Sequence, residues 1–135
     1  QMHRKRGLWD SNLYDLQGLY GFEYGMSKRD RLIHGQTVMT HAMLFTGVDV
    51  VDGSPRRWRV ENSWGTKESG DKGFFTMNDN WFDDYMFEIA SPTSKLSEEM
   101  RKGLETSATM LPAWDPMGSL ARRGDLFGQS SEISQ

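Results

Sequence analysis

Apolar side chains are concentrated in the middle of the chain, between Leu8 and Ile89, and both ends are polar and charged. Within this stretch their spacing is typical of short strands and turns rather than of long helices. The end that reads RRGDLFGQSSEISQ has too few apolar positions to help fill a core. We therefore expect a folded part over residues 1–121 and a polar, disordered extension over residues 122–135.

The clearest β-type pattern begins at Thr37, in the stretch VMTHAMLFTGVDVV, which is rich in β-branched residues and lacks proline. Apolar residues occupy both alternating sets of positions, which predicts a central strand covered on both faces, with His41 pointing inward. The turn residues of DGSPRR then lead to WRVENSW, as expected for an antiparallel hairpin with a loose loop. In this arrangement His41 and Asn62 are near neighbours.

The remaining segments predict a mostly β middle of the chain. Glycines interrupt any long helix between Leu8 and Tyr24, where we expect strand and turn. Further along, we expect GTKESGDKG to be a polar loop, GFFTM a strand, NDNWFDD a turn or short helix, and YMFEIA a strand.

Two short helices are predicted from capping signals. Ser27 stands three residues before Asp30, a capping-box spacing that favours a helix over Lys28–His34. Ser97 is followed by two glutamates, which favours a helix over Glu98–Leu104. The segment LPAWDPMGSLA contains two prolines and is expected to be extended over another surface.

Composition narrows the possible functions. The 135 residues carry a net charge of −3, which gives no general attraction to nucleic acid or anionic membranes, and no apolar run approaches a membrane span. The basic clusters HRKR, SKRDR and SPRRWR, the last with Trp58 between arginines, are a weak signal for nucleic acid and are more often solvated faces. The start QMHRKRGLWD lacks the apolar centre of a signal peptide and is typical of a position inside a longer protein, so we expect a fragment of a cytoplasmic protein.

The chain has no cysteine, which excludes disulfides, thiolate metal sites and a cysteine nucleophile within these residues. The histidines do not have HExxH spacing, and Asp79, Asp83 and Asp84 do not have EF-hand spacing, so we expect no metal and no cofactor. We expect those aspartates to lie in a solvated turn. Ser63 is not surrounded by a GxSxG elbow, which argues against a serine hydrolase.

Two segments together resemble a known family. THAM, which contains His41, and RVENSWG, which contains Asn62 and Trp64, resemble the histidine and asparagine segments of papain-like cysteine peptidases. GLWDSNLYD, NDNWFDDYMFEI and LPAWDPMGSLA extend the resemblance to the bleomycin hydrolase family, over Gly7 to Ala121. The resemblance implies an α+β fold, namely the C-terminal, antiparallel, β-rich and barrel-like part of a papain-like peptidase with short helices.

The same resemblance implies a cytoplasmic cysteine aminopeptidase that assembles as a homohexamer and hydrolyses peptide N-termini and related amides. His41 matches the base that ionises the thiol, Asn62 the residue that orients the imidazole, and Trp64 a shield that keeps water from their hydrogen bond. Taken singly, His41 would be a core histidine, Asn62 a turn residue and Trp64 a packing residue. The nucleophilic cysteine would come from an upstream half of the protein, so the chain alone should be inactive.

The C-terminus departs from the family pattern. The resemblance implies that the chain ends near Ala121 inside the active-site cleft, where its carboxylate meets the substrate's amino group. Here residues 122–135 follow, so we expect either clipping or altered exopeptidase behaviour. The alternative function is a non-catalytic binding or assembly module that has kept the fold, with nucleic-acid binding as a weak possibility because some family members bind DNA.

Overall fold

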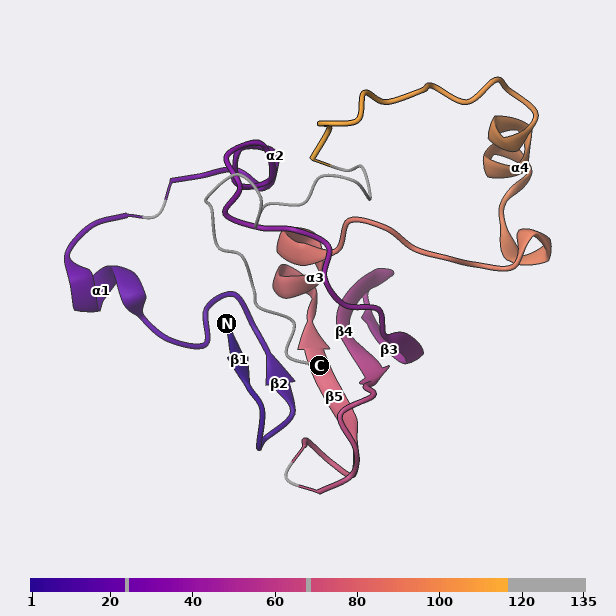
Figure 1. The fold of residues 1–135 in the computed structure, drawn as a ribbon. Helices are drawn as coiled ribbons and strands as arrows, with labels where there is room; N and C mark the ends of the chain where they lie inside the picture. Colours follow the sequence, from indigo (N-terminus) through magenta and orange to yellow (C-terminus); the bar gives the residue numbers. More distant parts are fainter. Residues whose placement is uncertain (24, 68, 117–135) are drawn as a thin grey trace, which may run out of the picture. The chain divides into compact units, whose positions relative to one another are not determined.

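The computed structural model describes residues 1–23, 25–67 and 69–116 and confirms the expected α+β class (Figure 1). Its elements in chain order are β1 (Met2–His3), β2 (Leu8–Trp9), α1 (Leu16–Tyr20), α2 (Lys28–Ile33), β3 (Leu44–Val51), β4 (Ser54–Glu61), β5 (Phe74–Asn78), α3 (Asp79–Tyr85), the 3₁₀ turn η1 (Thr93–Lys95) and α4 (Glu98–Leu104). The chain forms two compact units, residues 1–28 with 40–87 and residues 29–39 with 88–135. The first unit contains the whole sheet.

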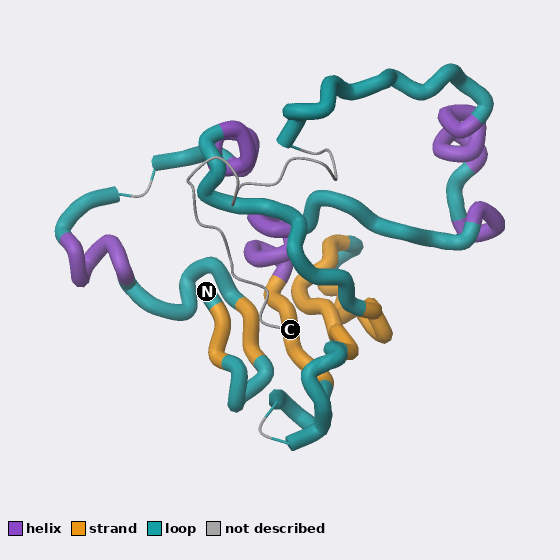
Figure 2. The backbone as a smooth tube through the Cα atoms, viewed as in Figure 1, coloured by secondary structure: helices purple, strands orange, loops and turns teal. Residues whose placement is uncertain are grey.

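The five strands form one sheet in the order β1-β2-β5-β4-β3 (Figure 2). Neighbouring strands are antiparallel except β2 and β5, which are parallel. Strand β4 is an interior strand, because β3 and β5 pair with its two edges, and β5 is the middle strand of the five. The strand after Thr37 that we expected in the centre is at the edge of the sheet instead.

The observed strand is also shorter than the predicted one, since β3 begins at Leu44 and not at Thr37. The ladder starts with the pair Leu44↔Glu61, where β4 ends, and the next backbone N–H, that of Asn62, donates to the carbonyl of Gly73 at 3.0 Å. Residues 37–43 pair with no strand among the residues that the structure describes. The expectation that both faces of β3 are covered is wrong as well, because Leu44 and Val48 are 61% and 50% exposed.

The hairpin between β3 and β4 is tighter than expected. Val51 pairs with Ser54, so only Asp52 and Gly53 form the turn, and both have positive φ, 51° and 80°. This is the backbone of a two-residue turn in which Asp-Gly is a favoured pair, because glycine adopts positive φ without steric cost. The dipeptide Asp52-Gly53 is the part of the sequence that specifies this turn, and the residues SPRR after it belong to β4.

The core lies on the face of the sheet that α3 covers. Trp9, Val60, Phe75 and Met77 are buried there, and Trp81 and Phe82 of α3 pack against them. The rings of Trp9 and Trp81 stack with centroids 5.2 Å apart, and those of Trp58 and Phe82 stack at 4.7 Å. NDNWFDD is thus a helix rather than a turn, and its aromatic side chains close the core.

Two other expected strands are corrected. Residues 16–20 form α1, because the Asp15 side chain accepts the N–H of Gly18 at 2.8 Å and Gly21, at φ 70°, ends the helix. The expected strand YMFEIA does not form, since α3 runs to Tyr85 and residues 86–90 pair with no described strand. Residues 16–20 are helical because of their caps, and residues 86–90 form no strand because no described strand pairs with them. The periodicity of the sequence reveals neither condition.

The second unit contains the short helices that capping signals predicted. Helix α4 spans Glu98–Leu104 as expected, and the Ser97 hydroxyl accepts the N–H of Met100 at 3.2 Å. Helix α2 ends at Ile33, one residue before the predicted end. Among the described residues no helix is long and apolar enough to cross a membrane.

Candidate active site

Strand pairing brings His41 and Asn62 together. His41 lies three residues before β3 and Asn62 lies directly after β4, so the antiparallel pairing of these strands places both at the same end of the hairpin. His41 Nε2 is 2.8 Å from Asn62 Oδ1, a hydrogen-bond distance. The proximity predicted from the sequence is therefore present, although His41 reaches it from a loop rather than from a strand.

The Asn62 side chain is held by its surroundings and is only 8% exposed. Its backbone N–H donates to Gly73, and its Oδ1 also accepts the backbone N–H of Ser63 at 2.8 Å. Because the amide group has distinct donor and acceptor ends, these contacts fix which end faces His41. The buried Nδ2 has no partner among the described residues, which leaves a donor for a group outside them.

The bond to Asn62 determines the tautomer of His41. An amide oxygen only accepts hydrogen bonds, so Nε2 must carry the proton that is donated to Oδ1. In the neutral ring Nδ1 then keeps its lone pair, and no described residue forms a hydrogen bond with it. Since His41 is exposed, Nδ1 is available to take a proton from an incoming group.

Trp64 lies against the imidazole. The rings of His41 and Trp64 stack with centroids 5.2 Å apart and an interplanar angle of 24°. The buried Phe75 meets Trp64 edge-on at 5.8 Å and 87°, which connects the indole to the core. The stacked contact between Trp64 and His41 is present, and the predicted role of Trp64 as a shield against water stays a prediction.

Two further residues contact this arrangement without a clear signal in the sequence, Phe75 and Arg4. Phe75 is one of two consecutive phenylalanines, and only its parity in β5 shows that it faces the core. The guanidinium of Arg4 lies over the Trp64 ring, 5.2 Å from its centroid. Arg4 stands in the cluster HRKR, which looks solvated in the sequence, and no local signal distinguishes it from Arg6.

The other predicted residues lie outside this arrangement. Ala121 and residues 122–135 lie outside the described residues, so their predicted roles stay predictions. Trp58 packs against Phe45 and Phe82, and its N–H donates to Asp79 at 2.8 Å, so its indole is held within the first unit. Asp79, the first residue of α3, therefore accepts a hydrogen bond from a tryptophan that packs against the core and is not part of a solvated turn.

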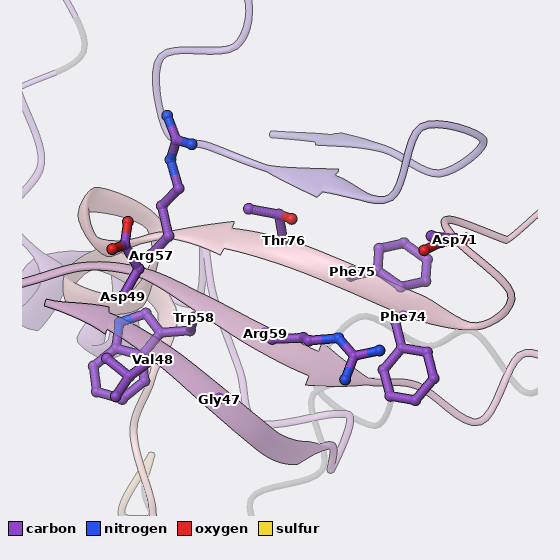
Figure 3. A pocket seen from close by; sticks show the side chains of 10 residues that line it. All are labelled: Gly47, Val48, Asp49, Arg57, Trp58, Arg59, Asp71, Phe74, Phe75 and Thr76. Atoms are coloured by element: carbon purple, nitrogen blue, oxygen red, sulfur yellow. The ribbon is translucent and has the colours of Figure 1, made fainter.

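No group of three or more potential metal ligands occurs in the part of the chain that the structure describes. A hollow lies elsewhere on the sheet, lined by residues of β3, β4, β5 and the preceding loop (Figure 3). There the guanidinium of Arg59 lies 3.8 Å from the ring centroid of Phe74. The hollow includes neither His41 nor Asn62, so it is separate from the paired side chains.

Comparison with known proteins places this geometry in a family. Residues 1–118 match the model of the Peptidase C1-like family. The chain is 44% identical over 122 residues to aminopeptidase C of Lactobacillus delbrueckii subsp. lactis and 46% identical over 121 residues to human bleomycin hydrolase, in each case over 87% of the chain. The structure of PepW from Lactobacillus rhamnosis HN001 matches 86% of the chain with a TM-score of 0.77 at 40% identity.

The paired histidine and asparagine at one end of the β3–β4 hairpin of an α+β fold thus occur in a chain of the peptidase class. The chain belongs to the Peptidase C1-like family. It spans about a quarter of the length of the relatives it matches, 27% of aminopeptidase C and 26% of bleomycin hydrolase. The family resemblance stated from the sequence is confirmed.

Proposed function

We propose that this chain supplies the base and its orienting residue to the active site of a cysteine aminopeptidase. The observation that carries the proposal is the 2.8 Å contact between His41 Nε2 and Asn62 Oδ1, with Nδ1 left open and Trp64 stacked on the ring. The relatives of the chain are named aminopeptidase C and bleomycin hydrolase, and these names support peptide N-termini and related amides as its class of substrate. The 135 residues contain no cysteine, so the nucleophile comes from another segment of the whole protein.

The chemistry follows from the tautomer. A cysteine thiol placed at Nδ1 gives its proton to His41, and the resulting imidazolium keeps its Nε2–H bond to Asn62. The thiolate attacks the carbonyl carbon of the scissile amide, and the C–N bond breaks as His41 returns the proton to the leaving amine. Water then hydrolyses the thioester, and the enzyme is regenerated. Without the thiol none of these steps occurs, so we propose that the chain alone is inactive.

We further propose that the whole protein acts on peptides in the cytoplasm as a homohexamer, with the cysteine-bearing half as the immediate partner of this chain. The location, the assembly state and the partner are all inferred from the resemblance to the bleomycin hydrolase family. Sedimentation of the whole protein measures its assembly state. A monomer at all concentrations would contradict the hexamer without affecting the proposed chemistry.

The test of the proposed function uses the whole protein that contains this chain. Labelling with an epoxysuccinyl thiol-protease inhibitor should be specific to one cysteine, and hydrolysis of an aminoacyl amide should disappear in the His41→Ala variant. His34→Ala is the matched control, because His34 lies in the second unit, just after α2. Full turnover in the His41→Ala variant, or an intact gene without such a cysteine, would favour the non-catalytic module instead.

A further inference from the structure

Arg4 is the charged residue that contacts the indole of Trp64. It lies in the turn between β1 and β2, is exposed, and holds its guanidinium carbon 5.2 Å from the centroid of the Trp64 ring. A guanidinium within about 6 Å of an indole centroid is attracted by the negative face of the ring. Trp64 is itself 36% exposed, so this attraction acts on a ring that the core holds only in part.

The backbone of Arg4 is fixed to the loop that follows Trp64. Its carbonyl accepts the N–H groups of Gly7 at 3.1 Å and Gly70 at 3.0 Å. Gly7 and Gly70 are in close contact, because a Cβ at Gly7 would lie 2.5 Å from the Cα of Gly70. The turn between β1 and β2 and the loop after Trp64 are therefore held together by backbone contacts, and the Arg4 side chain extends from a fixed point.

The contacts form a continuous sequence from Arg4 to the imidazole. Arg4 lies over Trp64, Trp64 stacks on His41, and His41 is hydrogen-bonded to Asn62. Phe75 supports one edge of the indole from the core, but an edge-on contact leaves the ring free to tilt about that edge. A second attachment is needed to hold the plane of the indole against the imidazole, and Arg4 occupies that position.

We propose that Arg4 is a positioning residue for His41 and acts through Trp64. It holds the indole in the stacked orientation, and the stacked indole keeps water from the Nε2–H···Oδ1 bond. The proposal that this matters for turnover rests on the proposed function, in which His41 is the base. The positioning itself is a property of this chain and is measured without catalysis.

The direct test is NMR of the whole protein that contains this chain, with its histidines isotopically labelled. In the Arg4→Ala variant the ring-current displacement of the His41 ring protons should shrink, and the Nε2–H should exchange with water roughly two- to fivefold faster, the Boltzmann equivalent of one exposed cation–π contact. Arg4→Lys keeps a cation and should recover most of both signals. Arg6→Ala removes the same charge from the same turn, where its side chain contacts no described ring, and should leave both signals unchanged.

A double-mutant cycle tests the route of the effect. In a Trp64→Leu background, Arg4→Ala should not accelerate Nε2–H exchange further, because the indole through which Arg4 acts is absent. Thermal unfolding of each variant, measured in parallel, separates this local effect from loss of the fold. Unchanged His41 signals in a folded Arg4→Ala variant would overturn the proposal, as would an equal acceleration in the Trp64→Leu background.

Kinetics of the whole protein separate this proposal from the proposed function. Arg4→Ala should lower kcat by roughly two- to fivefold with KM unchanged, because the contact holds the base rather than the substrate. If the NMR signals change while His41→Ala retains full turnover, the positioning by Arg4 stands and the catalytic role of His41 fails. If His41→Ala is inactive and Arg4→Ala behaves as wild type in both measurements, the positioning role fails and the catalytic role stands.

Discussion

Asn62 accepts a hydrogen bond from His41 at the position directly after the end of β4. The last pair of the hairpin, Leu44↔Glu61, leaves His41 and Asn62 on the two chain segments that emerge from the same end of the sheet. Their side chains meet at 2.8 Å, and the backbone N–H of Asn62 donates to Gly73, the next position after the β4–β5 pair Glu61↔Phe74.

We expect Asn62→Ala to impair catalysis less than His41→Ala. The first change leaves the imidazole without the acceptor that selects its tautomer, and the second removes the proposed base, so His41→Ala should cost roughly 10²–10⁴-fold in kcat. The measurement is steady-state hydrolysis of an aminoacyl amide by the whole protein. Equal rates for Asn62→Ala and wild type would show that the bond seen here does not orient the base.

Phe75→Ala should destabilise the sheet and loosen the site together. The ring is 2% exposed and packs on Trp9 and Trp64, so its removal leaves a cavity that costs about 3–5 kcal/mol of unfolding free energy. Urea denaturation followed by tryptophan fluorescence measures this change. Leu19→Ala, at a position that is 71% exposed, is the control and should stay within about 0.5 kcal/mol of wild type.

Gly70→Ala should be poorly tolerated. Gly70 has φ 58°, and a Cβ there would lie 2.2 Å from the carbonyl oxygen of Phe74, so both the backbone and the space exclude a side chain. The loss of unfolding free energy should exceed about 1 kcal/mol. Gly103→Ala makes the same change in α4, where no atom lies within 4 Å of the added Cβ, and should be neutral or stabilising.

Acid should weaken the first unit through Asp10. Burial alone would raise the pKa of Asp10, but hydrogen bonds from the Asn80 side chain, the Asn12 backbone and the Asn78 side chain bring the pKa below its ordinary value. A lowered native pKa stabilises the fold above the unfolded pKa, and this contribution is lost as pH falls through the native value.

The corresponding measurement is the unfolding free energy between pH 7 and pH 2. Asp10→Asn should reduce the decline below about pH 4, where the unfolded carboxyl takes up its proton. Glu99→Gln, which removes an exposed carboxylate from α4, is the control. A decline of the same size in the Asp10→Asn variant would show that this carboxyl does not carry the acid sensitivity.

Removing residues 122–135 should sharpen aminopeptidase activity relative to endopeptidase activity. The family resemblance places a carboxylate near Ala121 in the cleft, where it meets the substrate's amino group, and the extension replaces that free end with a peptide bond. Product analysis with a peptide substrate, before and after trimming of the whole protein, measures the ratio. The same products from both forms would contradict a role for the extension.

The fold could be predicted where the signal is local. Ser97 specified the start of α4, and the turn residues after Val51 indicated a hairpin, because capping and turn geometry depend on only a few neighbouring residues. The stretch after Thr37 was misplaced for the opposite reason. Whether an apolar strand is central or at an edge depends on which strands pair with it, and periodicity carries no information about pairing.

The sequence by itself determined the family and the residues of the pair, because His41, Asn62 and Trp64 stand in segments that are typical of that family. Tertiary structure decided the tautomer of His41, the edge position of β3 and the placement of Arg4 over Trp64. These features depend on contacts between residues that are distant in the chain. Such contacts form only when the strands pair, and no single segment of the sequence encodes them.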